Sequence, residues 1–188
     1  MSEINLRRIG EKVLKKASSL GAASAEVFLS RSRDLTIEVS NQQVETMKLA
    51  EEQGLSIRVF MNHRLGFVYS SDFTDSALDQ MVTQAIANAK STEEDQYNRL
   101  PPKPAEKYPD PDIFDGDILR VPVEEKIELA KDIENRARKR DSRIKITERC
   151  SYSDSSYEVA VYNSLGISGE YQGAYCGAAA FLVAEEQG

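Results

Sequence analysis

One pattern of alternating residues occurs twice in this chain of 188 residues, at a constant offset of 122 positions, as from residue 35 to residue 157. Apolar residues that alternate with polar ones indicate strands with one buried face. An amphipathic helix pattern precedes each copy, at residues 5–20 and 124–140. The repeat predicts an α+β fold of two related helix-plus-antiparallel-sheet units. The matched positions of the first strands are Leu35, Ile37, Val39 and Asn41, against Tyr157, Val159, Val161 and Asn163.

The second copy stops earlier than the first. After the first copy, the chain continues past Gly66 into a predicted return strand and a helix over residues 72–90. The second copy reaches the equivalent position at Gly188. We therefore expect the sequence to be the N-terminal part of a longer protein, truncated in its second unit. The matched positions of the later strands are Ile57, Val59 and Met61, against Ala179, Phe181 and Val183.

A proline-rich stretch separates the two copies. Proline lacks an amide donor and interrupts helices, so this stretch predicts an extended connector. The predicted organisation is a first unit over residues 1–94, a Pro-rich linker over 95–121 and a second unit over 122–188. Five of the six prolines lie in the linker, at Pro101, Pro102, Pro104, Pro109 and Pro111.

The overall charge excludes some function classes. The net charge is −7, which disfavours nucleic-acid binding, because phosphate contacts need clustered Lys and Arg. No stretch approaches the ~20 apolar residues of a membrane span, and the N-terminus lacks the apolar core of a secretory signal. Two cysteines, Cys150 and Cys176, without such a signal predict a cytoplasmic protein.

The residues that could carry catalysis are sparse. His63 is the only histidine, it lies in a predicted turn, and no HExxH or HExxxH motif is present. The glycines fit neither GxGxxG nor a P-loop. The carboxylates of residues 124–134 are explained by a solvated helix face, and the basic run 136–140 by a solvated helix end. We expect no catalytic residue, no metal ligand and no cofactor in this chain.

A glycine- and tyrosine-rich stretch leaves two interpretations open. Its glycines are explained by turns and close strand packing. They also favour a groove that a peptide or another backbone could approach, with tyrosines along it. The candidate peptide-binding or interface residues are Tyr162, Gly166, Gly169, Tyr171, Gly173 and Tyr175.

Several segments in order resemble one known family. The segments "TIEVSN", "VETM" followed by "EEQGLSIRVF", and "RLGF" within residues 25–90 are similar to the first domain of the TldD/PmbA family. The later stretch "VAVYNSLGISGEY", followed by "CGAAAFLVAEEQG", resembles the middle segment of that family, and the ending is closer to the PmbA (TldE) type.

The resemblance implies a function for the whole family. Its members are described as modulators of DNA gyrase and as metallopeptidases, and the TldD type carries a zinc-binding HExxxH helix beyond the region matched here. The PmbA type lacks that motif and pairs with a TldD-type partner, and the pair cleaves unfolded or small peptides. No catalytic residue of the family falls on this sequence.

We therefore expect a fragment that is inactive alone, shapes a peptide cavity and assembles with a TldD-type partner or with itself. The alternative is a non-enzymatic interaction module that uses an exposed sheet edge. A nucleic-acid binder linked to gyrase fits the acidic charge poorly. The edge left without a return strand predicts pairing between chains.

Overall fold

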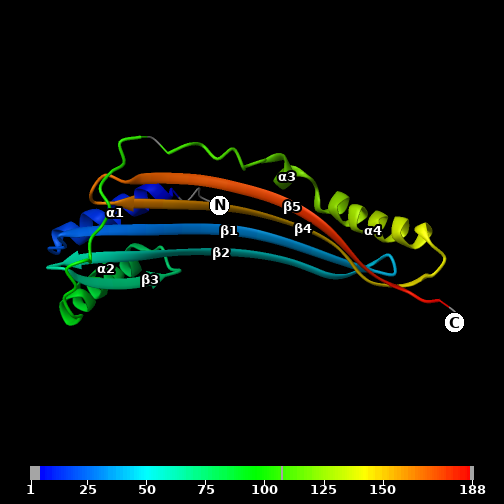
Figure 1. Cartoon of the computed structure of the whole chain (residues 1–188), viewed down its shortest axis with the longest axis horizontal. Coiled ribbons are helices and arrows are strands. Elements are labelled where there is room, and N and C mark those ends of the chain that lie inside the picture. Colours follow the sequence, from blue (N-terminus) through cyan, green and yellow to red (C-terminus); the bar gives the residue numbers. More distant parts are fainter. Residues whose placement is uncertain (1–4, 107, 187–188) are drawn as a thin grey trace. The chain divides into compact units, whose positions relative to one another are not determined.

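A computed structural model describes residues 5–106 and 108–186, which form an α+β fold (Figure 1). Five strands make one sheet in the order β3-β2-β1-β4-β5. β2 and β3 form an antiparallel hairpin, whereas α2, α3 and α4 separate β3 from β4 along the chain. The elements are α1 (Leu6–Ser19), β1 (Ser24–Ser40), β2 (Gln43–Met61), β3 (Arg64–Ser70), α2 (Asp75–Ser91), α3 (Asp117–Arg120), α4 (Val123–Arg140), β4 (Ile144–Asn163) and β5 (Ser168–Ala184).

The chain divides into two compact units that are interleaved along the sequence. Unit 1 comprises Met1–Arg31, Glu52–Pro111 and Glu158–Tyr171. Unit 2 comprises Ser32–Glu51, Asp112–Tyr157 and Gln172–Gly188. Each long strand thus contributes one stretch to each unit. The boundaries at residues 94 and 121, and the common origin of the two copies, stay predictions, although a helix followed by a long hairpin does occur twice.

The strands are longer than the alternation predicts. The alternation at residues 35, 37 and 39 lies in the second half of β1, which begins at Ser24, and β2 begins at Gln43, well before the alternation at residues 57–61. The residues that join the halves of β1 are polar and only partly buried. A polar residue on an exposed part of a sheet keeps its backbone hydrogen bonds, so the strand continues where the apolar signal ends.

Two tight turns fix the first hairpins. Asn41 and Gln42 have φ angles of 50° and 60°, and Asn62 and His63 have φ angles of 49° and 60°. Two consecutive residues with positive φ form the type I′ turn that matches the twist of paired strands. The predicted hairpin turn around His63 is confirmed.

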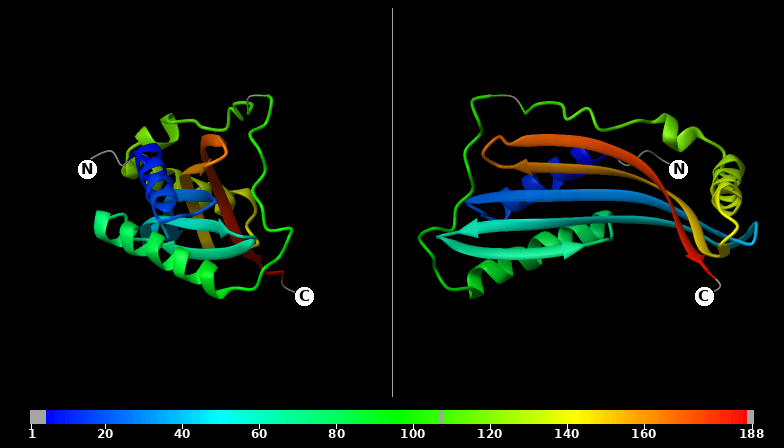
Figure 2. Two further views of the ribbon diagram at one scale, coloured as in Figure 1. Left: turned by 90° about the vertical axis from the view of Figure 1, so that its left-hand side faces the viewer. Right: turned by 45° about the vertical axis from the view of Figure 1, so that its right-hand side comes forward.

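Unit 1 has an apolar core beneath two helices. Figure 2 shows α1 and α2 beside each other along the strands. The buried side chains come from both helices and from β1, β2 and β4, with Leu29, Ile57 and Val82 fully buried. The close approach of β3 to α2 requires Gly66, because a Cβ there would lie 1.9 Å from the carbonyl oxygen of Ala85.

Unit 2 has a smaller core beneath α4. The buried apolar cluster of this core comprises Leu35, Ile37, Val39, Ala130 and Tyr152. The prediction that a solvated helix face explains the carboxylates of residues 124–134 holds for Glu124, Glu125 and Glu128, which are exposed, but is wrong for Glu134. Glu134 is 0% exposed, and Lys126 on the same face is 3% exposed. The buried stripe of α4 runs through Lys126, Ala130 and Glu134, each four residues from the next.

These buried charges are paired. Lys126 Nζ lies 2.5 Å from Asp154 Oδ2. Glu134 accepts hydrogen bonds from the backbone N–H groups of Asn41 at 2.8 Å and Gln42 at 2.7 Å. Burial opposes the ionisation of Glu134, but the hydrogen bonds from Thr147, Gln42 and Asn41 outweigh it and hold its pKa below the usual value. The carboxylate on α4 thereby fixes the β1–β2 turn.

Every helix in the described ranges is too short or too polar to span a bilayer.

Candidate peptide-binding pocket

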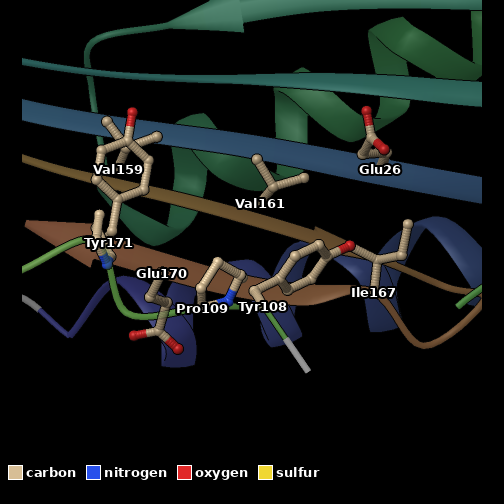
Figure 3. A pocket seen from close by; sticks show the side chains of 10 residues that line it. Glu26, Tyr108, Pro109, Val159, Val161, Ile167, Glu170 and Tyr171 are labelled. Carbon is tan, nitrogen blue, oxygen red and sulfur yellow. The ribbon is translucent and has the colours of Figure 1, made fainter. Parts of the chain in front are cut away.

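Unit 1 contains an apolar pocket with a cavity volume of about 480 Å³. Figure 3 shows Val159 and Val161 of β4 in this pocket, with Tyr108 and Pro109 of the connecting segment beside them. The residues that line it are Glu26, Tyr108, Pro109, Pro111, Val159, Val161, Ile167, Gly169, Glu170 and Tyr171.

The floor of the pocket follows from the two-residue period of β4. Val159 and Val161 line the pocket, whereas Ala160 and Tyr162 between and after them are buried in the core of unit 1. Successive side chains of a strand point to opposite faces. The pocket therefore lies on the sheet face that the helices of unit 1 leave open.

One wall comes from the segment between α2 and α3. Tyr108, Pro109 and Pro111 contribute to this wall, and proline fixes the backbone without needing an amide partner. A Cβ at Gly169 would lie 3.6 Å from the ring of Tyr108, which is an ordinary van der Waals contact. The ring of Tyr108 therefore lies directly beside β5.

The turn between β4 and β5 is held by Asn163. Its Oδ1 accepts hydrogen bonds from the N–H groups of Leu165 and Ile167, both at 2.9 Å. Gly166 has a φ of +96°, a conformation that favours glycine. Ser164 ties the turn to β1, because its N–H donates to the carbonyl oxygen of Ala25 at 2.8 Å. These bonds place Ile167 in the pocket wall.

The two carboxylates at the pocket are neutralised by arginines. Glu26 accepts a hydrogen bond from Arg58, and Glu170 accepts one from Arg7. The rest of the lining is apolar or tyrosine. Because a buried charge needs a partner and these carboxylates already have theirs, the pocket fits a neutral, apolar group.

The six residues predicted for this function lie in different places. Gly169 and Tyr171 line the pocket, and Tyr171 is 43% exposed. Gly166 lies in the adjoining turn. Tyr162 lies in the core, 3% exposed, and burial together with the carboxylate of Glu170 raises the pKa of its hydroxyl. Gly173 and Tyr175 belong to unit 2.

Tyr162 packs against helix α1. A Cβ on Gly10 would lie 2.3 Å from its ring. Its hydroxyl makes no hydrogen bond of normal geometry within the described residues, although it is near Glu170. Tyr162 therefore acts as a packing residue behind the pocket rather than as part of its surface.

The sequence did not predict that Val159 and Val161 form the floor of the pocket, or that Tyr108 and the neighbouring prolines form one wall. The alternation at Val159 and Val161 was visible, but nothing in the sequence showed which face they occupy. Tyr108 lies in a segment without a periodic pattern, so only the fold brings it to β5.

A metal site does not fit the described ranges, in which no three His, Cys, Asp or Glu side chains are grouped. His63 lies in a turn. Cys150 is buried and Cys176 is exposed, and both are free thiols. Burial raises the pKa of the Cys150 thiol, which disfavours the reactive thiolate.

Two family models match most of the chain. Residues 25–89 match PmbA/TldA metallopeptidase domain 1, and residues 116–188 match the PmbA/TldA metallopeptidase central domain. A Metalloprotease PmbA homolog of Haemophilus influenzae is 30% identical over 170 residues, or 90% of this chain and 37% of that protein. Metalloprotease PmbA of Escherichia coli O157:H7 is 28% identical over 186 residues, or 97% of this chain and 41% of that protein.

Solved structures share the fold. TldE from Thermococcus kodakarensis superposes with a TM-score of 0.80 at 19% identity, covering 95% of this chain and 40% of that one. A candidate modulator of DNA gyrase from Bacteroides thetaiotaomicron gives a TM-score of 0.86 at 21% identity, covering 100% of this chain and 43% of that one. The sequence thus spans about two fifths of the length of these relatives.

Proposed function

Because the chain belongs to the PmbA/TldD metallopeptidase family, we propose that it is the peptide-binding and assembly part of such a peptidase and is not catalytic by itself. The apolar pocket of unit 1 carries this proposal. It holds one apolar side chain of an unfolded or small peptide, while the rest of the peptide remains outside.

The size and lining of the pocket support a peptide side chain as its occupant. A volume of about 480 Å³ accommodates a Leu or Phe side chain with room for adjoining backbone. Burial of such a side chain contributes about 1.5–3 kcal/mol, which suits weak binding of many sequences. Because no charge in the pocket is unpaired, selection between peptides rests on apolar area alone.

The metal of the peptidase is held elsewhere in this proposal. The described residues offer no cluster of ligands, and we derive no step through a metal ion. Relatives named metalloprotease are more than twice as long as the matched region, since the match covers 37–41% of their length. A TldD-type subunit is the proposed partner, and a role in modulating gyrase and a cytoplasmic location belong to the same proposal.

Peptide binding can be measured by fluorescence anisotropy. The probe is a short, neutral, fluorescein-labelled peptide with a central Phe, compared with the same peptide carrying Ser instead. We expect the Phe peptide to bind at least about tenfold more tightly. The variants Tyr171→Ser and Tyr108→Ser should remove most of that preference, because both rings line the pocket.

The matched control is Tyr69→Ser, which changes a tyrosine of unit 1 that is 78% exposed and lies outside the pocket. Equal effects of the three variants would contradict the pocket as the binding site. The second part of the proposal, that the chain is not catalytic by itself, is tested by incubating it with zinc and an unfolded peptide and analysing the products by mass spectrometry. Cleavage by the wild-type chain would overturn the non-catalytic role.

A second candidate function is an interaction module without any enzymatic role. The observation that favours it is the place of β5 at one end of the strand order, with the side chains of Tyr175 and Phe181 exposed. It predicts that peptide binding survives every pocket variant.

A further inference from the structure

The pocket of unit 1 is larger than one apolar side chain requires. Its volume of about 480 Å³ leaves room for peptide backbone next to the side chain. Apolar area selects between side chains, but the backbone that enters beside a side chain adds a second criterion. A peptide N–H that enters the pocket gives up its hydrogen bond to water, and a buried N–H without a partner weakens binding. The lining therefore decides which kind of backbone the pocket accepts.

The floor of the pocket is hydrocarbon. Val159 and Val161 of β4 form it, as Figure 3 shows. β4 lies between β1 and β5 in the sheet, so the strands on both sides use its backbone N–H and C=O groups. A peptide N–H above the two valines thus meets apolar carbon and not an acceptor.

The polar side chains of the walls are already bonded or lie to the side. The carboxylates of Glu26 and Glu170 each accept a hydrogen bond from an arginine. In Figure 3 the carboxylate of Glu170 points away from the valines, and the hydroxyls of Tyr108 and Tyr171 lie at opposite ends of the lining. The centre of the pocket therefore suits a group that needs no hydrogen bond.

The chain's own backbone at the pocket is of this kind. The segment between α2 and α3 meets the pocket through Tyr108, Pro109 and Pro111. Two of these three residues are prolines, which have no backbone N–H. Irregular backbone can lie against an apolar lining when it carries few donors, because buried donors need partners.

We infer that the pocket selects peptides in which a proline enters it. The selection for proline rests on the proposed function of the pocket and names the class of peptide that it takes. Proline brings a neutral, apolar ring without an N–H, so both its side chain and its backbone match the lining. Tyr108 and Tyr171 supply partly exposed aromatic rings beside the floor. Aromatic-lined grooves are a recurring way to bind proline-rich segments.

Fluorescence anisotropy with two pairs of labelled peptides tests the selection. Each peptide carries one central residue between glycines and serines. The first pair has proline or valine at the centre, and the second has N-methylalanine or 2-aminobutyrate. The members of a pair have the same number of carbon atoms, and only the first lacks the N–H. We expect the first member of each pair to bind at least about fivefold more tightly.

Variants of the floor separate the missing N–H from the stiffness of proline. Val161→Thr and Val159→Thr keep the shape of the side chain and add a hydroxyl that can accept a hydrogen bond from a peptide N–H. In at least one of them, the valine and 2-aminobutyrate peptides should bind more tightly, so that the preference within each pair falls below about twofold. The stiffness of a free peptide is the same whichever variant it meets, so a preference due to stiffness would not change.

The matched control is Val44→Thr, which changes a valine of β2 that is 40% exposed and lies outside the pocket lining. It should leave the preference within each pair as in the wild-type chain. Equal binding within each pair would overturn the selection for proline, and so would a preference that stays unchanged in both floor variants.

The peptide with a central phenylalanine is measured in parallel. If it binds through the pocket while the two pairs show no preference, the selection for proline fails and the pocket remains a peptide site. If none of the peptides binds, the one with phenylalanine included, the proposed function fails together with the selection for proline.

Discussion

The two units bury different kinds of side chain in their cores. Among the described residues, the main buried cluster of unit 1 is apolar and lies beneath two helices, and no charged residue of that unit is buried. The apolar cluster of unit 2 is smaller and lies beneath one helix, together with the buried side chains of Lys126, Glu134 and Asp154. Apolar burial stabilises without directional requirements, whereas buried charges stabilise only while their partners stay in place.

This difference predicts how strongly substitutions and pH change the stability of each unit. Loss of an apolar group from unit 1 removes contacts in proportion to the volume lost. Loss of one charged partner from unit 2 leaves the other charge buried alone, which costs more than the pair contributes. Unit 2 should therefore respond more strongly to single substitutions and to pH.

The largest effect is expected for Lys126→Met in unit 2. The side chains of Lys126 and Asp154 are 3% and 0% exposed, so the substitution removes the hydrogen-bonded partner of a buried carboxylate. Arg33 also forms an ion pair with Asp154, but its nitrogen lies 3.6 Å away, beyond hydrogen-bond distance, so it offsets only part of the loss. We expect a loss of about 3–5 kcal/mol in the free energy of unfolding.

Hydrogen exchange measures where that loss falls. Protection should fall in α4 and in the unit 2 part of β4, while α2 of unit 1 keeps most of its protection. The double variant Lys126→Met with Asp154→Leu should recover most of the stability, because it removes both charges. A single variant as stable as wild type would contradict the contrast between the units.

Leu29→Ala is the matching test in unit 1. Leu29 is fully buried in the apolar core, and the cavity should cost about 2–5 kcal/mol. Because this cost comes from lost apolar packing and not from the titration of a side chain, it should be the same at neutral and at mildly acid pH. Urea unfolding at both pH values gives the comparison, and a loss that changed strongly with pH would show that unit 1 also depends on charge.

Glu134→Gln should have an intermediate effect that depends on pH. The pKa of Glu134 is lowered in the folded chain, so its carboxylate stabilises unit 2 above the ordinary value of 4.5. That stabilisation is lost as the pH falls through the lowered pKa. At neutral pH, the variant should lose about 1–3 kcal/mol, and below the lowered pKa the difference from wild type should shrink.

The control for this variant is Glu128→Gln on the same helix. The Glu128 side chain is 71% exposed and forms a surface ion pair with Lys131, so this change should alter stability by less than about 0.5 kcal/mol at any pH. Parallel stability profiles for Glu134→Gln and wild type between neutral and acid pH would refute a role for the carboxylate.

The sequence predicted the elements of the fold well, and for a physical reason. The stripes of α1 and α2 and the alternation in β1 and β2 arise from local periods of 3.6 and 2 residues. On α4 the buried position of Lys126 could not be predicted, because a buried lysine carries no apolar signal. Its partner Asp154 lies 28 residues away, and only the fold brings the two charges together.

The candidate site was less predictable. The sequence does not distinguish Tyr162 from Tyr171, but their side chains lie on opposite faces of neighbouring strands. Tyr162 is in the core of unit 1, and Tyr171 lines the pocket. Which face a residue takes depends on the turn that Asn163 and Gly166 form between the strands. A shift of one residue in that turn would exchange the two roles. Tyr108 could not be found, because it reaches the pocket through an aperiodic segment.

The smallest expected effect concerns the N-caps of α2 in unit 1 and of α4 in unit 2. The N-cap of α2 is Thr74, whose hydroxyl accepts a hydrogen bond from the N–H of Ala77 at 3.4 Å. The N-cap of α4 is Pro122, which has no side-chain hydrogen bond. Pro122→Asp should supply a cap worth about 1 kcal/mol, offset by about 0.4–1 kcal/mol for the loss of proline's restriction of the unfolded chain.

The net change from Pro122→Asp should therefore be a small gain, below about 0.6 kcal/mol. Thr74→Ala in unit 1 should instead lose about 0.5–1 kcal/mol, because nothing offsets the lost cap. Urea midpoints for the two variants give opposite signs if the helix starts differ as described. A clear loss of stability for Pro122→Asp would mean that the restriction of the unfolded chain by proline outweighs the gain from a new cap at the start of α4. Unit 2 would then be stabilised in two ways despite its small core, by its buried charges and by this restriction of the unfolded chain.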